Sequence, residues 1–548
     1  MKHLRQTNWR TSKFFDKRSR DVKKTIPSAI ALVLATVAVS ASVQAQTPKR
    51  GGILNYAVVA ELPSTDCHRE TTFAMVHPVA PQYSTLLKLT GPHDNTKIVG
   101  DLAESYEVSK DGLTYTFKLR RGVKFHDGSD FSSADIKATY DRIRNPPEGV
   151  VSARKALHAA IDTIETPDAF TAIFKLSQVD MSLLLQFASP FNCVFSAAEL
   201  AKDINYPSKK VMGTGAFQFV EYVKGAHWVA KRFDGYFLKD RPYLDGYKAY
   251  IVKGTTVVSG LQGGQFDAEF RGRSPAERDQ LVGAMGDKIK VTEGPWITNI
   301  QLIVNNERKP FDDVRVRQAL SLAIDRWGGG VHLGKVSLIK DVSGTFRPGA
   351  SWSLPMSEIE KIPGYWRDIE KSRTEARRLL AEAGVPNLKL KFLNRQLGQP
   401  FQPAGIYAVD QWRRVGIQAE HMELETKLYF DVLGKGEFDV AVNNISDFAD
   451  DPSAQFNTLL SKKTSAISYA RHSDEKLDDL FSRQAREVDP LKRMALVNDF
   501  ERHSLTQAYS FPLLWYQRIV ANNKKVKGWD LQPSHFAGQT LVDVWLDE

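Results

Sequence analysis

The polar stretch 443–451, which reads NNISDFADD, contains the side chains best suited to hold a ligand. It follows the apolar run 438–442, which predicts a buried strand. In α/β proteins, loops at strand ends are frequent ligand sites, because they present backbone and short polar groups on a rigid base. The stretch is therefore a candidate binding loop. The alternative is a solvated acidic turn with no binding role, formed by Asp447, Asp450 and Asp451.

Residues that would support bond chemistry are not arranged in a known catalytic pattern. The chain has no G-x-S-x-G, H-E-x-x-H or C-x-x-C motif, and none of its 12 histidines forms an i, i+4 pair. Gly329–Lys335 has the glycine and lysine spacing of a phosphate loop, but Val336 replaces the hydroxyl residue that would hold magnesium. The sequence therefore predicts a protein that is not an enzyme, with no metal and no cofactor. A secreted hydrolase is the alternative from another class.

The elements that would position the polar stretch alternate between strands and helices. Asp111-Gly112 is a turn dipeptide between two alternating apolar runs, which predicts a hairpin, and a helix is expected over 135–144. In the second half of the chain, the alternation of expected strands and helices predicts α/β layers. Its expected strands are 296–304, 388–392, 417–422, 438–442 and 511–520, and its expected helices are 372–383, 406–415, 477–486 and 491–505.

Length and charge narrow the class of protein. A chain of 548 residues is too long for one hydrophobic core, so two or more domains are expected. The formal net charge is +10, but residues 1–45 hold nine Lys/Arg and two Asp/Glu, which leaves only +3 on the remainder. Because that remainder mixes acidic and basic residues, no nucleic-acid partner is predicted.

Residues 1–45 have the features of a cleavable signal peptide. A basic segment up to Lys24 precedes the apolar run 29–39, and Val43-Gln44-Ala45 has small residues where a signal peptidase needs them, so cleavage is expected after Ala45. The alternative is a membrane anchor, for which the apolar run falls short of the ~20 residues required. We expect a soluble protein of a Gram-negative periplasm. In that oxidising compartment Cys67 and Cys193 either pair or remain two buried thiols, and the sequence leaves both possibilities open.

Three blocks of the chain carry a resemblance to a known family. They are the stretch from Ile98 to Tyr140, the turn Gly213–Phe217 with Ala216 where proline is usual, and the block from Lys309 to Arg326. In this order they resemble the family-5 extracellular solute-binding proteins, the dipeptide, oligopeptide and nickel receptors of ABC importers. The resemblance runs from about Gly51 to the C-terminus.

The resemblance implies an α/β, two-lobe periplasmic binding protein fold (type II, cluster C) with an extra subdomain on the first lobe. After the signal peptide 1–45, lobe I would span 46–302, with the subdomain at about 91–209. Lobe II would span 303–509, and 510–548 would return to lobe I. The hinges would be the crossovers near 299–305 and 511–515. The protein would be a monomer that closes around a small-molecule or short-peptide ligand and delivers it to an inner-membrane ABC permease.

The resemblance also implies a set of cleft residues: Phe73, Trp296, Arg395, Asn443, Asn444, Asp447 and Phe448. Arg395 matches the arginine that binds the ligand carboxylate in the dipeptide-binding branch. Peptide-binding members carry a tryptophan and an amine-binding aspartate at the positions of Ile445 and Phe448, and both are absent here. A short peptide is the leading ligand class. The alternative is a non-peptide solute that bears a carboxylate or an aromatic group.

Overall fold

A computed structural model describes residues 47–90 and 97–548 of the chain. The expected signal peptide and its cleavage site lie outside these residues. None of the helices in the described part of the chain is both long and apolar enough to cross a membrane. The chain forms several β-sheets covered by helices, so the expected α/β class is confirmed.

The N-terminal half contains two four-stranded sheets. The first has the order β1-β10-β9-β8, in which β1 lies parallel to β10. The second has the order β4-β5-β7-β6 and contains the hairpin expected from Asp111-Gly112. The strands of these sheets and of the small β2–β3 pair are β1 (Ile53–Val58), β2 (Leu87–Thr90), β3 (Lys97–Gly100), β4 (Ala103–Val108), β5 (Thr114–Leu119), β6 (Ile161–Asp168), β7 (Thr171–Leu176), β8 (Phe217–Val223), β9 (His227–Arg232) and β10 (Gly246–Ile251).

Short helices surround these sheets. The expected helix after the hairpin is α2, whose start is fixed by a reciprocal capping box between Ser132 and Asp135. Its Tyr140 packs against Phe174 and Phe187 in an aromatic core under the second sheet. The helices of this half are α1 (Phe73–Val79), α2 (Ser133–Arg144), α3 (Leu183–Gln186), α4 (Ala197–Lys202), α5 (Thr255–Gln262) and α6 (Pro275–Met285).

The C-terminal half is built on one six-stranded mixed sheet of order β12-β16-β11-β15-β13-β14. Strand β13 lies parallel to both of its neighbours, which matches the predicted strand–helix alternation. Its strands are β11 (Ile289–Val304), β12 (Ile339–Asp341), β13 (Lys389–Arg395), β14 (Gln418–Leu424), β15 (Val440–Ser446) and β16 (Ser510–Asn523). A separate pair joins β17 (Val526–Lys527) to β18 (Trp545–Leu546).

Helices cover this sheet, and most begin at an aspartate whose side chain accepts an N–H of the first turn. Such caps are Asp313, Asp325, Asp368, Asp451, Asp474 and Asp489. The helices are α7 (Val314–Leu322), α8 (Arg326–Val336), α9 (Met356–Ile359), α10 (Ile369–Glu382), α11 (Phe401–Arg413), α12 (Thr426–Lys435), α13 (Pro452–Phe456), α14 (Glu475–Arg486) and α15 (Pro490–Gln507). The glycine-rich segment 328–330 lies in helix α8. Helix α12 was not predicted from the sequence.

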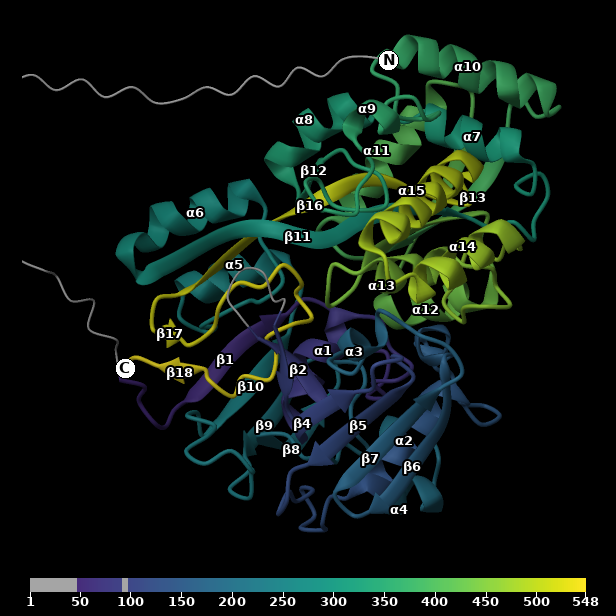
Figure 1. Cartoon of the computed structure of the whole chain (residues 1–548). Helices are drawn as coiled ribbons and strands as arrows, with labels where there is room; N and C mark the ends of the chain where they lie inside the picture. Colours follow the sequence, from purple (N-terminus) through teal and green to yellow (C-terminus); the bar gives the residue numbers. More distant parts are fainter. Residues whose placement is uncertain (1–46, 91–96) are drawn as a thin grey trace, which may run out of the picture. The chain divides into compact units, whose positions relative to one another are not determined.

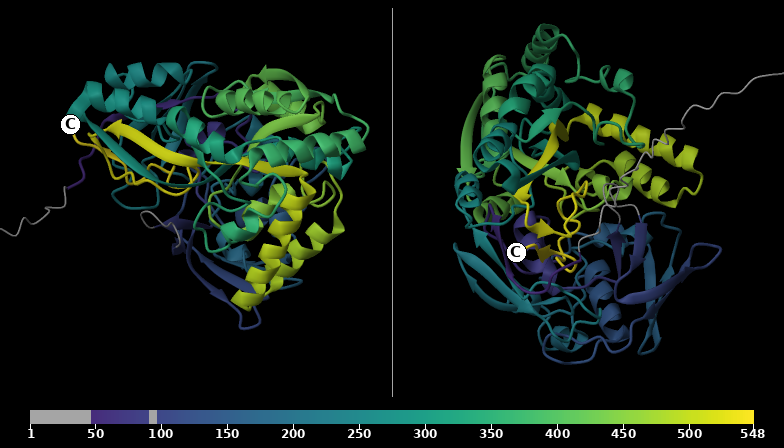
Figure 2. Two further views of the ribbon diagram at one scale, coloured as in Figure 1. Left: turned by 90° about the horizontal axis from the view of Figure 1, so that it is seen from above. Right: turned by 90° about the vertical axis from the view of Figure 1, so that its left-hand side faces the viewer.

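Two long antiparallel strands of the six-stranded sheet, β11 and β16, extend beyond the rest of the sheet to lie beside α6 (Figure 1). Seen from above, β16 (yellow) passes from the teal helices into the green ones (Figure 2). Their pairing is irregular between Pro295 and Asn299 and again at Ile300–Gln301. These irregularities start just before the hinge expected at 299–305. The lobe boundaries and the hinges stay predictions.

Candidate ligand-binding site

A narrow cavity lies where the ends of β13 and β15 meet residues from the N-terminal half of the chain. Its volume is about 40 Å³. Threonine, asparagine and aromatic side chains make up most of its wall, together with three arginines and one carboxylate. The lining residues are Thr71, Thr72, Phe73, Arg154, Arg271, Thr298, Arg395, Phe401, Phe430, Asn443, Asn444, Ile445, Ser446, Asp447, Ala454, Asn457, Thr458, Ile467, Tyr469, Tyr516, His535 and Phe536.

Arg395, the last residue of β13, is 2 % exposed and reaches into this cavity. Its Nε donates to Thr426 Oγ1 at 3.0 Å, and one terminal nitrogen donates to Thr72 Oγ1 at 3.4 Å. No carboxylate in the described part of the chain lies within ion-pair distance of its guanidinium. Burial, together with a second arginine, Arg271, lowers the pKa of Arg395 to about 10. It therefore stays charged at neutral pH.

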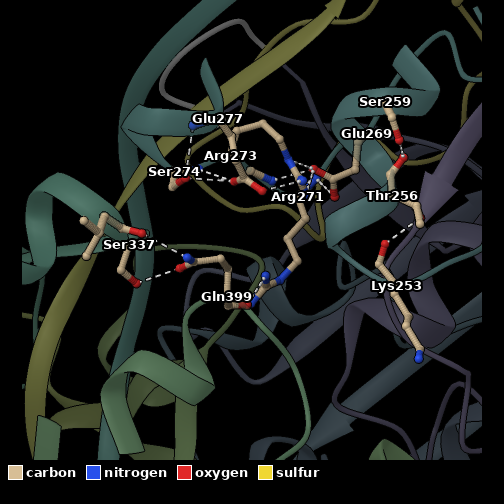
Figure 3. Close-up of polar contacts among 12 residues, drawn as sticks. Lys253, Thr256, Ser259, Glu269, Arg271, Arg273, Ser274, Glu277, Ser337 and Gln399 are labelled. Carbon is tan, nitrogen blue, oxygen red and sulfur yellow. Dashed lines mark hydrogen bonds and ion pairs between the residues drawn. The ribbon is translucent and has the colours of Figure 1, made fainter. Parts of the chain in front are cut away.

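Arg271 enters the cavity from the turn that precedes α6. Its guanidinium donates to the Gln399 carbonyl at 2.8 Å, while the nearby Glu269 carboxylate pairs instead with Arg273 at 3.0 Å (Figure 3). Gln399 is itself held by Ser337 at 2.7 Å. Burial lowers the pKa of Arg271. Arg271 and Arg395 are thus two buried cations without a carboxylate partner among the described residues, and both face the same cavity.

The other charged groups of the cavity are Arg154 and Asp447. Arg154 donates to the Glu70 backbone carbonyl and lies over the Phe191 ring at 3.8 Å. Burial raises the pKa of Asp447 to about 6, although the charge of Arg154 opposes that shift. Burial also raises the pKa of Glu70, next to Thr71, to about 8. Burial thus favours the neutral form of both carboxyl groups.

The polar stretch 443–451 is a strand end followed by a buried turn, and not the loop expected from its sequence. Strand β15 continues to Ser446, so Asn443 and Asn444 lie on the strand and face the cavity from there. Asp450 pairs with Arg347 at 2.9 Å, and Asp451 caps α13 and pairs with Arg493 at 3.4 Å. Asp450 and Asp451 are therefore not simply solvated, while a binding role for Asp447 stays a prediction.

Five of the seven expected cleft residues line the cavity: Phe73, Arg395, Asn443, Asn444 and Asp447. Trp296 does not. It packs behind the wall, against Tyr516 and His535 with ring centres 4.8 and 5.1 Å apart. Phe448 is 1 % exposed and belongs to the main hydrophobic core. Because its ring turns into that core, it does not occupy the position of an amine-binding residue.

Several lining residues were not predicted from the sequence, among them Arg154, Arg271, Tyr469, Tyr516 and His535. Each lies outside the family blocks recognised above, and no motif surrounds them. His535 has no hydrogen-bond partner for either ring nitrogen among the described residues, and burial keeps its pKa well below the usual range. Among residues 47–90 and 97–548, no cluster of three His, Cys, Asp or Glu residues could hold a metal ion.

The segment that carries Thr71, Thr72 and Phe73 is held by a disulfide. Cys67 and Cys193 are bonded, with Cα atoms 6.0 Å apart, so the alternative of two separate thiols is wrong. Arg142 forms a buried ion pair with Asp66 at 2.6 Å and donates to His68 Nδ1. The His68 proton therefore lies on Nε2, which donates to the Cys193 carbonyl at 3.0 Å. These contacts fix the approach of the segment to the cavity.

Comparison with known proteins agrees with this architecture. Residues 97–466 match the family model described as bacterial extracellular solute-binding proteins, family 5 Middle. The glutathione-binding protein GsiB of Pectobacterium atrosepticum is 29% identical over 469 residues, which cover 81% of this chain and 85% of that protein.

Two solved structures have the same fold. DppA of Helicobacter pylori in complex with the peptide STSA has a TM-score of 0.80 at 23% identity, and covers 91% of this chain and 99% of its own. AgaA of A. tumefacien R10 in complex with agropinic acid has a TM-score of 0.81 at 24% identity, with the same coverage. The expected type II periplasmic binding protein fold is thereby confirmed. The chain belongs to the bacterial extracellular solute-binding proteins of family 5, and it is a substrate-binding receptor.

Proposed function

We propose that this receptor captures a short, peptide-like solute with a free carboxylate in the periplasm and delivers it to an inner-membrane ABC permease. The observation that carries the proposal is Arg395, a buried guanidinium that faces a cavity and has no carboxylate partner in the described part of the chain. A guanidinium suits a carboxylate because its planar fork meets both oxygens. Relatives named for glutathione and a neighbour solved with a peptide support a peptide-like ligand.

Binding affinity for a panel of short peptides, measured by calorimetry, tests the ligand class. Saturable binding of peptides that lose affinity on C-terminal amidation is expected, because amidation removes the carboxylate. Equal binding of free and amidated peptides would contradict the proposal. Incubation with peptide and ester substrates should yield no product, since we propose no bond chemistry for this site.

A second candidate is a non-peptide solute that bears a carboxylate. It is favoured by the absence of an aspartate at position 448, where the family resemblance led us to expect one, and by the neighbour solved with agropinic acid. Native mass spectrometry of receptor purified from its own periplasm would separate the two candidates by the mass of the bound molecule.

The mechanism that we propose is closure of two lobes around the ligand. Several hydrogen bonds join the N-terminal half of the chain, or its C-terminal tail, to the six-stranded-sheet half at the cavity. They are Arg271 to the Gln399 carbonyl, Arg395 to Thr72, Asn457 to the Ala153 carbonyl and Ser534 to the Asp447 carbonyl. The narrow cavity leaves little room for a ligand to enter, so these contacts must separate first. Ligand contacts on both sides then favour the closed state, which the permease would recognise.

Closure predicts a change that scattering can detect. Saturating ligand should lower the radius of gyration, because the lobes approach each other, and raise the melting temperature by the linkage between binding and folding. Small-angle scattering and thermal melts on the mature protein measure the two effects. If the scattering curves with and without a tightly bound ligand superimpose, the lobes do not close on the ligand and the proposed mechanism is wrong.

Export by the leader is a further part of the proposal. The mature protein should begin at Gln46 and be found in the periplasmic fraction, because cleavage is expected after Ala45. N-terminal sequencing of the purified protein checks this. Recovery of the chain in the membrane fraction with Met1 at its start would support an anchor instead.

A further inference from the structure

A second and larger cavity lies outside the candidate ligand site. It is an open groove of about 910 Å³, and it shares no lining residue with the narrow cavity that Arg395 faces. Its walls come from the β8–β9 hairpin, from the segments 61–65 and 208–211, and from the start of α12. Cavities of this size with a mainly apolar and aromatic lining are typical sites for small organic molecules. The groove is therefore large enough to hold one.

Three aromatic side chains of the β8–β9 hairpin form the apolar wall of the groove. Phe219 and Tyr222 pack against Trp228, with ring centres 4.8 and 5.4 Å from its own. Trp228 is buried, whereas Phe219 and Tyr222 are only partly buried, so their rings are open to a molecule in the groove. Leu62 and Val211 add aliphatic surface. An apolar body, and an aromatic one in particular, can pack against this wall.

Four lysines line the same groove. Three of them, Lys209, Lys210 and Lys427, already lie within ion-pair distance of carboxylates that do not line it. The fourth, Lys224, is exposed in the turn between β8 and β9, and no carboxylate of residues 47–90 or 97–548 lies within ion-pair distance of it. Lys224 is therefore the lysine best able to pair with an anion in the groove.

The two carboxylates that line the groove are held by donors of the protein itself. Glu61 accepts a hydrogen bond from the Tyr222 hydroxyl and another from Gly225 N at 2.7 Å. Glu425 is the N-cap of α12 and accepts from Lys427 N at 3.1 Å. Since the lysines outnumber these carboxylates four to two, the lining has a net positive charge. Such a lining favours an anion over a cation of the same shape.

We propose that this groove binds a small amphipathic anion, whose apolar body packs on Phe219 and Tyr222 and whose single acidic head group pairs with Lys224. The site is separate from the cavity that Arg395 faces, so this inference goes beyond the proposed capture of a peptide-like solute. A carboxylate with an aromatic or alkyl body has the chemistry that both parts of the groove require.

Four compounds test the proposal by calorimetry with the mature protein. Three share a biphenyl body: 4-phenylbenzoate is an anion, 4-phenylbenzamide is neutral, and 4-phenylbenzylamine is a cation. The anion should bind about fivefold more tightly than the amide, which is the factor that a favourable exposed ion pair supplies, and the cation should bind most weakly. This preference should shrink at high salt, which screens exposed charges. Benzoate, which lacks the second ring, should bind about tenfold more weakly than 4-phenylbenzoate.

Variants assign the two parts of the site. Lys224→Gln should remove most of the preference for the anion and leave the affinity for the amide unchanged. Val211→Glu should weaken 4-phenylbenzoate by about tenfold, because it sets a carboxylate against the apolar body. Lys110→Gln is the matched control, since Lys110 is also exposed in a hairpin turn, between β4 and β5, away from the groove. It should leave every affinity unchanged, and thermal melts identify any variant that fails to fold.

One further variant separates the groove from the ligand cavity. Arg395→Ala should bind 4-phenylbenzoate as tightly as the wild type does, because Arg395 does not line the groove. If affinity for the probe falls in Arg395→Ala, the probe lies in the ligand cavity and the proposal is overturned. Equal affinity for the anion and the amide would overturn it as well, as would a preference that survives in Lys224→Gln. If none of the biphenyl compounds binds, the groove is no site for this class, while the receptor role stands.

Discussion

Arg395→Ala is expected to weaken ligand binding by about 2–5 kcal/mol, because it leaves the ligand carboxylate buried without its partner. The loss should be large since Arg395 is 2 % exposed and its hydrogen bonds to Thr72 and Thr426 hold it in place before the ligand arrives. A guanidinium that is already held in place loses little conformational entropy when the ligand binds. Calorimetry with the best-binding ligand of the peptide panel measures the change.

Two controls distinguish a binding effect from a folding effect. Arg395→Lys should recover only part of the affinity, because an ammonium keeps the charge but loses the two parallel hydrogen bonds. Arg326→Ala removes a guanidinium that is also buried and that donates to Pro512 and Ser321, so it should lower the melting temperature and leave affinity unchanged. If the Arg395→Ala variant binds the ligand as tightly as the wild type, Arg395 does not bind a ligand carboxylate.

Much of the fold was predictable because its signals are local. The hairpin needs only Asp111-Gly112 between alternating runs, and α2 needs only the pair Ser132 and Asp135. Strand β11 shows the limit of such signals. The sequence predicted it from Trp296, where it becomes apolar, but it starts at Ile289, because pairing with β16 also orders a more polar segment. Pairing between distant strands decides that boundary.

The candidate site was predictable only where it coincides with family blocks or strand ends. Arg395 and Asp447 were found in this way, and both line the cavity. Arg154 and Arg271 were missed, because no motif surrounds either of them and the fold brings both to the cavity from far along the chain. Nothing in their neighbouring residues distinguishes them from surface arginines.

Phe448 shows the limit of placing a side chain by family resemblance. The resemblance predicts that it lines the cleft, yet its ring packs into the main core. Phe448→Asp would therefore bury a carboxylate among apolar side chains and not create an amine site. The neighbouring residue Asp447 lines the cavity, whereas Phe448 does not.

Removing the disulfide with the double variant Cys67→Ser, Cys193→Ser is expected to lower the free energy of unfolding by roughly 5 kcal/mol. The two cysteines are separated by 126 residues, and closing so long a loop restricts the unfolded chain strongly. Chemical denaturation of the oxidised protein and of the double variant measures the difference. A reducing agent should destabilise the wild type and leave the variant unaffected, which separates the disulfide from any effect of serine.

The same variant should also weaken ligand binding, because the disulfide holds the segment that presents Thr72 and Phe73 to the cavity. The ion pair of Arg142 with Asp66 and the hydrogen bond of His68 to Cys193 remain in the variant and keep part of the segment in place. The loss of affinity should therefore be smaller than in Arg395→Ala, because no ligand-contacting group is removed. Calorimetry at a temperature where the variant is fully folded checks this order. If the double variant binds as tightly as the wild type while its stability falls, the disulfide supports the fold alone and does not position the site.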